Sequence, residues 1–397
     1  MRYKELIASL SSSIRLFIAT RKRIYFIGFF FTFLITLNEV AKLAHNNFQI
    51  FSYGSLDFWR GINPYSGWNH LSLLGKQLDL FLYGPVFSIL FTPFTLLPWW
   101  LGPFCWNFFT YSLFYWSVFT LPDEYDFVKK KLIFFYPLLT LFCTLLSLQF
   151  NPVIASLFLF SFTLLEKNKG FWAVMLILLS TFTKVYGIFQ LTMLLFYPKL
   201  RNNVLSGILI AIVLLFLPVI NIPPTELVDY YQSWISTVTS HSDASRFFSI
   251  YRIVCTYFKT LEPYMGFLSL AIFIMILTFT IFRLRSFKES FFCRARFLGI
   301  LMSWVILFGL SSEKHTYVIA MTGYIIWYLS SRPDRLDRVL LWANFLFLGI
   351  MPIDILFPYK ISSFVLAKLH LGVIVFSITW FIMVYKTFFL FYKVDDN

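Results

Sequence analysis

The sequence predicts an all-α membrane protein, a polytopic helical bundle. Of its 397 residues, 59% are hydrophobic and only 13% are charged, and the mean hydropathy is +0.74. Apolar runs of about 20 residues recur, and each is long enough for a helix to cross ~30 Å of hydrocarbon. The runs are continuously apolar instead of alternating at every second residue, which disfavours a β-barrel. We therefore expect a single integral membrane domain over residues 1–397, with about 12 spanning or re-entrant helices.

The basic residues predict how the helices are oriented. The net charge is +14, but its distribution argues against a nucleic-acid partner, because Lys and Arg gather in short stretches between apolar runs. These stretches are residues 1–23, 129–131, 167–169, 199–201, 283–296 and 331–338, together with Lys386 and Lys393 near the C-terminus. Such clusters mark cytoplasmic ends of membrane helices. The expected partner is the lipid bilayer, with both termini in the cytoplasm.

The apolar runs can be placed in order along the chain. The first, at about 24–44, is too long for a cleaved signal and is predicted to be a retained anchor. In the C-terminal half, predicted helices alternate between the two sides of the membrane: 265–282, 297–311, 316–330, 339–357 and 363–385.

The middle runs do not alternate cleanly if all three lysine clusters are cytoplasmic. These runs are 83–98, 101–121, 132–149, 151–166, 170–197 and 204–221. One or two are therefore predicted to be half-membrane hairpins, and the break at 183–187 is a candidate. Non-helical backbone at that depth requires shielding by protein or by a wet cavity.

Two polar segments, residues 45–82 and 222–264, interrupt the apolar sequence. Both are expected on the outer, non-cytoplasmic face, where they would converge over a shared cavity. Within the second segment, residues 226–239 are predicted to form a helix that carries Tyr230, Tyr231 and Trp234. Selective chemistry is expected in these segments, because the surrounding chain is membrane-like.

Several short motifs occur in a characteristic order. They are Asn47-Phe48, Gly61-Ile62-Asn63-Pro64-Tyr65, Tyr83-Gly84-Pro85, Trp106-Asn107, Leu148-Gln149-Phe150-Asn151, the Lys184 segment and residues 311–317. In this order and spacing, across most of residues 40–330, the chain resembles glycosyltransferase family 87 of the GT-C superfamily. The resemblance implies a GT-C-like fold and an inverting hexosyltransferase that uses a polyprenyl-phosphate sugar on the non-cytoplasmic face. Characterised relatives are mannosyltransferases, and the acceptor would be a lipid-linked or envelope glycan.

This chemistry requires a base for the acceptor hydroxyl and a polar pocket for the leaving phosphate. Family members commonly carry Asp where this chain has Asn47, and an amide cannot accept the proton. Asp79 is the preferred substitute because branches of the family have a similar Asp-Leu-Phe-x-Tyr stretch, and Asp57 is the second. Either carboxylate would otherwise be a solvated loop charge or a helix cap. Because the usual Asp is absent, the alternative that this chain is an inactive relative of the family stays open.

His315 and Glu313 lie near the family's Ser-Pro…His-Tyr motif, although here the Pro is missing and Thr316 precedes Tyr317. An imidazole at this position would relay a proton or bind a phosphate, so His315 is the third catalytic candidate. The alternative is an ordinary interfacial histidine. Glu313 is a candidate substrate-binding residue.

Four basic residues are candidates for binding the donor phosphate: Lys184, Arg60, Arg246 and Arg252. Lys184 falls within an apolar run, where an ammonium is costly and is by default a functional candidate; the alternative is a snorkelling side chain. A guanidinium group has a geometry that suits hydrogen bonding to phosphate oxygens. The alternative for each arginine is an ordinary surface position outside the site.

The remaining substrate-binding candidates are uncharged. Asn47 keeps a place in the site as an amide, and Tyr65 and Tyr83 are candidates for stacking on sugars. Gln149 and Asn151 flank a turn, where they would bind sugar hydroxyls or satisfy freed backbone groups. No motif predicts a metal site or an organic cofactor. The polyprenyl-phosphate sugar is expected as a substrate, and a divalent ion is left open.

Two alternative functions share these features. One is a polysaccharide polymerase or ligase that acts on undecaprenyl-linked glycans. The other is a transporter or flippase for a lipid-linked sugar, which would show paired broken helices in two matching halves. Only one break is visible in this sequence, which favours the transferase. The Phe-rich and Lys-rich composition suits a bacterial inner membrane protein.

Overall fold

The computed structural model describes residues 20–240, 248–309, 312–353 and 356–390. The first half contains α2 (Arg21–Ala41), α3 (Asn46–Trp59), α4 (Pro85–Thr95), α5 (Leu101–Phe119), α6 (Phe127–Phe135), α7 (Leu138–Leu146), α8 (Asn151–Glu166), α9 (Gly170–Lys184) and the 3₁₀ segment η1 (Tyr186–Phe196). The middle contains α10 (Leu200–Phe216), η2 (Leu217–Ile220), η3 (Pro224–Glu226), α11 (Leu227–Ser240), α12 (Ile250–Tyr257) and η5 (Lys259–Tyr264).

The last third begins with α13 (Met265–Phe282), α14 (Leu284–Glu289), α15 (Phe291–Leu307), η6 (Lys314–Thr316), α16 (Tyr317–Leu329) and α17 (Arg335–Asn344). It ends with the π-helical η7 (Phe345–Ile350), α18 (Tyr359–Ser362), η8 (Ser363–Lys368), α19 (Leu371–Tyr385) and η9 (Lys386–Leu390). The described residues contain no strand, only one isolated bridge between Leu71 and Gln77.

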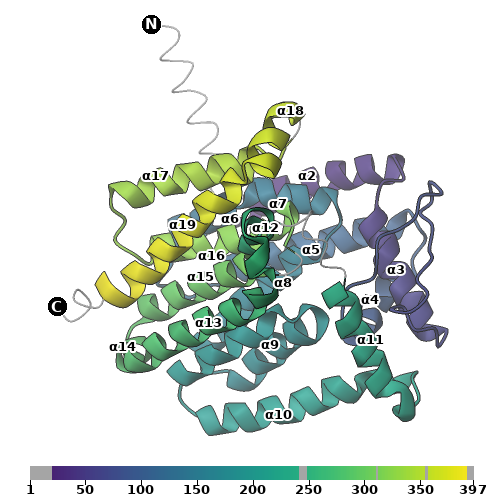
Figure 1. Cartoon of the computed structure of the whole chain (residues 1–397), viewed down its shortest axis with the longest axis horizontal. Coiled ribbons are helices and arrows are strands. Elements are labelled where there is room, and N and C mark those ends of the chain that lie inside the picture. The colour runs from purple at the N-terminus through teal and green to yellow at the C-terminus, as the bar shows by residue number, and fades with distance from the viewer. Residues whose placement is uncertain (1–19, 241–247, 310–311, 354–355, 391–397) are drawn as a thin grey trace, which may run out of the picture.

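The prediction of an all-α membrane protein is confirmed. Four described helical stretches are long and apolar enough to cross a membrane: Arg21–Ala41, Leu200–Ile220, Lys259–Phe282 and Leu371–Leu390. Figure 1 shows the long helices running in roughly one direction. We call the end that carries α3 and α11 the outer-segment end. The opposite end carries α14 and the end of α19, and we call it the basic end.

The predicted basic clusters gather at this basic end. Lys129 Nζ lies 5.5 Å from the ring centroid of Phe292 at the start of α15, and Glu166, next to Lys167, pairs with Arg294 of the same helix at 2.7 Å. Tyr197, next to the 199–201 cluster, donates to the same Glu166 at 2.6 Å. All three lysine clusters of the middle region therefore lie on one side, as the sequence required.

The predicted break at 183–187 explains how this is possible. Val185 ends α9 with φ of +60°, a left-handed conformation that β-branched residues rarely adopt. The chain then reverses into η1, which packs beside α9. The 170–197 run is thus a helical hairpin whose two ends both lie at the basic end and whose tip lies inside the protein.

Three other predicted runs also differ from simple spans. The 363–385 run is divided at His370, whose φ is +52°, into η8 and α19. The 132–149 run is divided into α6 and α7 around Pro137. The 83–98 run forms only the 11-residue α4, which at 1.5 Å per residue is too short to cross ~30 Å of hydrocarbon. Thr92 of α4 bonds Ser55 and Trp59 of α3, so α4 lies against the outer segment.

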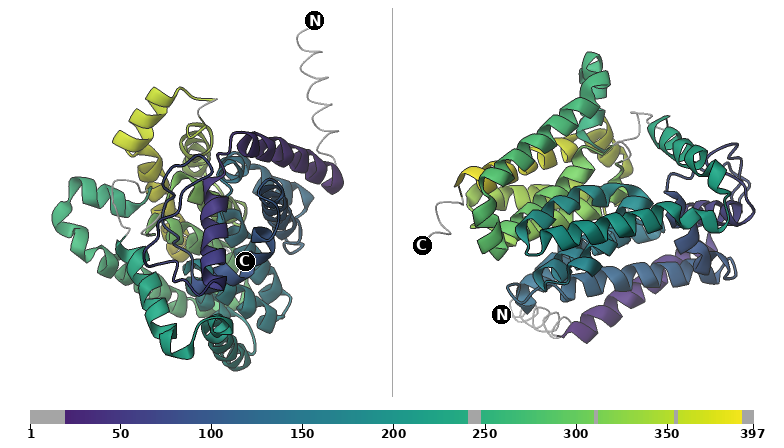
Figure 2. Two further views of the ribbon diagram at one scale, coloured as in Figure 1. Left: turned by 90° about the vertical axis from the view of Figure 1, so that its right-hand side faces the viewer. Right: turned by 90° about the horizontal axis from the view of Figure 1, so that it is seen from below.

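The core is built around α16, of which residues Tyr317–Trp327 are all buried. Helices α15 and α8 pack against it, whereas α10 and α13 are largely exposed and present their apolar side chains at the rim of the bundle. Figure 2 shows the bundle end-on, with α3 and the chain that follows it over one end.

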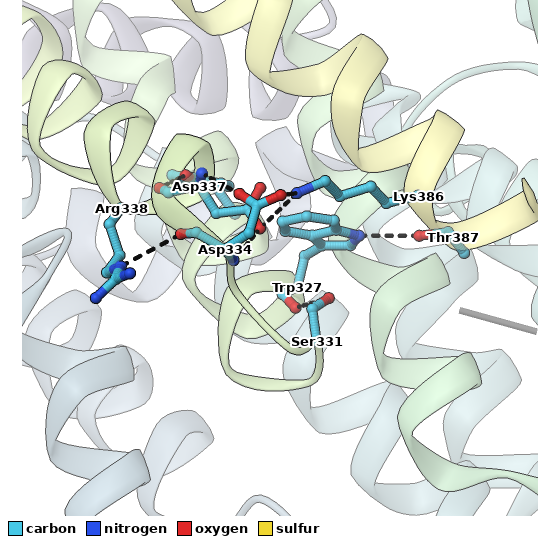
Figure 3. Close-up of polar contacts among 8 residues, drawn as sticks. Trp327, Ser331, Asp334, Asp337, Arg338, Lys386 and Thr387 are labelled. Carbon is cyan, nitrogen blue, oxygen red and sulfur yellow. Dashed lines mark hydrogen bonds and ion pairs between the residues drawn. The ribbon is translucent and has the colours of Figure 1, made fainter. Parts of the chain in front are cut away.

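An ion cluster fixes the C-terminal helix at the basic end (Figure 3). Lys386 Nζ lies 2.7 Å from Oδ2 of both Asp334 and Asp337. These two carboxylates also form the capping box that begins α17. The residue after Lys386, Thr387, accepts a hydrogen bond from the indole N–H of Trp327 at 2.9 Å. The cluster therefore joins α16, α17 and η9.

Candidate active-site cavity

A cavity of about 400 Å³ lies at the outer-segment end of the bundle. The first outer segment lines it through Asn47, Asp79 and Tyr83, and the second through Trp234, Val238 and Tyr251. Its floor comes from the membrane helices and their ends: Gln149, Lys184, Phe189, Met265, Trp304, Phe308 and Glu313. The two polar segments thus share one cavity, as their positions in the sequence led us to expect.

The outer segments meet at the Tyr83-Gly84 step. Trp234 donates its indole N–H to the carbonyl of Leu82 at 3.1 Å, and Tyr65 donates its hydroxyl to the carbonyl of Tyr83 at 2.6 Å. The backbone N–H of Gly84 donates to the carbonyl of Thr183 at 3.0 Å. A Cβ on Gly84 would lie 2.0 Å from the carbonyl oxygen of Phe182, so only glycine allows the loop to approach the hairpin tip.

A chain of hydrogen bonds crosses the cavity floor from Lys184 to Glu313. Lys184 Nζ donates to Asn151 Oδ1 at 2.6 Å, and Asn151 Nδ2 donates in turn to Gln149 Oε1. Gln149 Nε2 then donates to Glu313 Oε2 at 3.0 Å. The ammonium also lies 5.6 Å from the ring centroid of Tyr83 and 5.2 Å from that of Tyr186. These are cation–π distances.

Glu313 connects this chain to His315 and Asn47. His315 Nδ1 lies 3.6 Å from Glu313 Oε2, and its Nε2 shares a hydrogen bond with Ser147 Oγ at 3.0 Å. Asn47 donates its side-chain amide to the carbonyl of Ser147 at 2.7 Å. Motifs separated by more than 250 residues in the sequence therefore meet in one polar network.

The middle of the chain, residues 81–308, matches glycosyltransferase family 87. The chain belongs to glycosyltransferase family 87. No curated protein matches it. The family relationship makes the chain a membrane glycosyltransferase, and the predicted resemblance is confirmed. The match includes Tyr83, Gln149, Asn151 and Lys184, whereas Asn47, Asp79 and Glu313 lie outside the matched residues.

Two carboxylates, those of Glu313 and Asp79, line the glycosyltransferase cavity, and their surroundings differ. Burial alone would raise the pKa of Glu313, but the adjacent His315, the hydrogen bond from Gln149 and the charge of Lys184 outweigh it and lower the pKa to about 2. A carboxylate with so low a pKa is a weak general base. Asp79 lies on the cavity wall with its side chain exposed, and its Oδ1 accepts a hydrogen bond from the N–H of Leu80 at 3.0 Å.

Four of the predicted site residues lie away from this cavity or face another environment. Asp57 is buried and its carboxylate lies 2.7 Å from His70 Nε2, so it serves as the partner of a loop histidine. Arg60 is exposed at the end of α3. Tyr65 packs between Phe81 and Tyr230 and supports the wall from behind. Arg252 lies on α12 beside Tyr251 but does not line the cavity. Arg246 lies outside the described residues.

No pattern in the sequence indicated the apolar wall. Trp304 of α15 contacts Phe189 of η1 and Phe273 of α13, with ring centroids 4.3 and 5.1 Å apart, and Phe308 continues this surface. In the sequence, Trp304 and Phe308 are ordinary members of an apolar run. Only the reversal at Val185, which brings η1 against α15, gives them a role in the cavity.

The described residues contain no group of three or more His, Cys, Asp or Glu side chains able to hold a metal ion.

Proposed function

We propose that this glycosyltransferase transfers a hexose from a polyprenyl-phosphate sugar to a hydroxyl of a lipid-linked or envelope glycan. The observation that carries the proposal is the composition of the cavity. A lysine ammonium, an exposed carboxylate and an apolar aromatic wall line the same space. These are the groups required by an anionic leaving group, an acceptor hydroxyl and a prenyl tail.

In the proposed reaction, Asp79 removes the proton from the acceptor hydroxyl as its oxygen attacks the anomeric carbon. The bond between that carbon and the donor phosphate breaks with inversion. The electron pair of this bond leaves with the phosphate, whose added negative charge develops beside Lys184. A preorganised cation is most effective where charge develops in a low-dielectric site. The aromatic wall of Phe189, Trp304 and Phe308 would receive the first apolar units of the prenyl tail.

Incubation of purified protein with polyprenyl-phosphate mannose and a membrane glycan fraction tests this proposal. We expect release of polyprenyl phosphate together with a glycosylated acceptor. Polyprenyl-phosphate glucose is the matched second donor, because it tests whether mannose is preferred. Movement of an intact lipid-linked sugar across vesicles, with no bond cleavage, would contradict transfer and support the transporter alternative.

The orientation is a further part of the proposal. We place the basic end in the cytoplasm and the cavity on the outer face of a bacterial inner membrane, because clustered Lys and Arg resist translocation. In a variant without the four native cysteines, Ser66→Cys should react with a membrane-impermeant maleimide from outside intact cells. Asp123→Cys, at the basic end, should react only after the membrane is opened. The reverse pattern would overturn this orientation.

A further inference from the structure

We infer that Gln149 and Asn151 are positioning residues that keep the Lys184 ammonium apart from the Glu313 carboxylate. The ammonium is thereby reserved for an anionic ligand, the leaving phosphate of the donor. The inference rests on the proposed function, since it assigns a use to the cation of that cavity.

The direction of the hydrogen bonds identifies the two amides as a unit. An ammonium only donates, so Asn151 must present its oxygen to Lys184 and its nitrogen to Gln149. An ionised carboxylate only accepts, so Gln149 must present its nitrogen to Glu313 and its oxygen to Asn151. The bonds have this arrangement in the structure. Both amide orientations are thus dictated by the charges at the two ends.

The opposite charges do not contact each other. Among the described residues, no ion pair within 4.0 Å joins Lys184 to Glu313. The charge of Lys184 nevertheless helps to lower the pKa of Glu313, so the two groups are close enough to interact. The side chain of Asn151 is fully buried and that of Gln149 is 8% exposed, which makes both of them fixed spacers.

Separation of the charges changes what the ammonium can bind. A direct Lys–Glu pair would be a charge-assisted contact, and an incoming phosphate would have to displace a carboxylate. The neutral Asn151 oxygen competes less strongly than a carboxylate with an incoming phosphate, and it accepts only one of the three N–H donors of the Lys184 ammonium. The rings of Tyr83 and Tyr186 hold the ammonium in place. The cation is therefore both positioned and available.

Gln149→Met tests the inference, because it keeps the length of the side chain and removes the bridge. We expect the Kd for polyprenyl phosphate and the KM for the donor to rise about tenfold, the loss of roughly one charge-assisted contact, with a smaller change in kcat. Gln190→Met is the matched control. Gln190 is also buried and donates to the carbonyl of Phe158 at 2.9 Å, but it lies outside the cavity. Its loss should lower stability without changing either binding constant.

The double variant Gln149→Met/Glu313→Gln separates positioning from a merely structural role. Once the spacer is gone, Glu313 competes for Lys184, so removal of its charge should restore most of the affinity for polyprenyl phosphate. The inference is overturned if Gln149→Met binds polyprenyl phosphate as the wild type does, or if the double variant binds no better than Gln149→Met. A wild-type protein that fails to bind polyprenyl phosphate would instead refute the proposed function itself.

Discussion

At the scale of single residues, the two carboxylates that line the cavity, Glu313 and Asp79, have different surroundings. Glu313 lies beside His315 and accepts a hydrogen bond from Gln149, whereas Asp79 on the wall accepts a hydrogen bond from the N–H of Leu80. The side-chain amide of Asn47 donates a hydrogen bond to the carbonyl of Ser147. An aspartate at this position would place its negative charge against that carbonyl oxygen, so the donor that the amide supplies suits its surroundings.

Asp79→Asn should lower turnover by about 10²–10⁴-fold, the usual contribution of a general base, and leave folding intact because the side chain is exposed. The measurement is the rate of polyprenyl phosphate release, with thermal unfolding of the same preparation. Asp229→Asn is the control, since Asp229 is exposed on α11 and does not line the cavity. Wild-type turnover in Asp79→Asn would remove Asp79 from the mechanism.

Glu313 should make acid stability depend on pH in a defined window. Its pKa falls from 4.5 to about 2 on folding, so the folded protein binds this proton less readily than the unfolded chain. The stabilisation is complete above pH 4.5 and is lost as the pH falls toward 2. We expect Tm to fall less between pH 5 and pH 3 in Glu313→Gln than in the wild type. Parallel Tm curves for the two proteins would contradict the assignment.

At the scale of elements, the hairpin of α9 and η1 has the largest effect on the site. It carries Lys184 inward to the cavity, brings Phe189 against Trp304, and returns the chain to the basic end. The strained Val185 lies at its tip, and strain of this kind is retained where the surroundings fix it, commonly at functional sites. The loop that ends at Gly84 is held against this tip by the hydrogen bond from the Gly84 N–H to the carbonyl of Thr183.

Gly84→Ala should cost about 1–3 kcal/mol of stability, the usual range for overpacking, because its Cβ meets a backbone carbonyl that cannot move aside easily. Thermal unfolding in detergent, followed by tryptophan fluorescence, measures the effect. Gly266→Ala is the control, since its Cβ would meet nothing within 4 Å. In a helix this change should be neutral or stabilising by about 0.4–1 kcal/mol. Equal Tm values for the two variants would show that the close approach at Gly84 is unimportant.

At the scale of the whole molecule, the two ends of the bundle have different chemistry. The outer-segment end holds the cavity, while the basic end is closed by ion pairs between distant parts of the chain. The Lys386 cluster shown in Figure 3 connects the last helix to the rest. Asp337 is only 1% exposed, so the cluster includes one deeply buried charge.

Lys386→Met should destabilise the protein by about 3 kcal/mol or more, because it leaves the buried Asp337 carboxylate without its partner. The double variant Lys386→Met/Asp337→Asn should recover part of this loss, since it also removes the stranded charge. Lys360→Met, at an exposed position on α18, should change stability by no more than about 0.5 kcal/mol. Comparison of the Tm values in detergent tests all three. If the single variant Lys386→Met were as stable as the wild type, the ion cluster would contribute little to stability.

The sequence by itself determined the membrane class, the approximate bounds of several helices and the family. Composition and the length of apolar runs are local properties, and the membrane imposes them on every span. It also indicated the break near Lys184 as one candidate for a hairpin, because the middle runs could not alternate cleanly with three lysine clusters on one side. Most of the polar cavity residues, including Asn47, Asp79, Lys184 and Glu313, were recognised as candidates.

Only the tertiary structure decided which candidates share a site. It separated Asp79 from Asp57, moved Arg60 and Tyr65 out of the cavity, and joined Gln149 and Asn151 into one chain between opposite charges. It also added Trp304 and Phe308, which look like any other apolar residues of a span. The physical reason is that hydropathy fixes whether a segment is in the membrane, whereas the neighbours of a side chain depend on how segments far apart in sequence pack against each other.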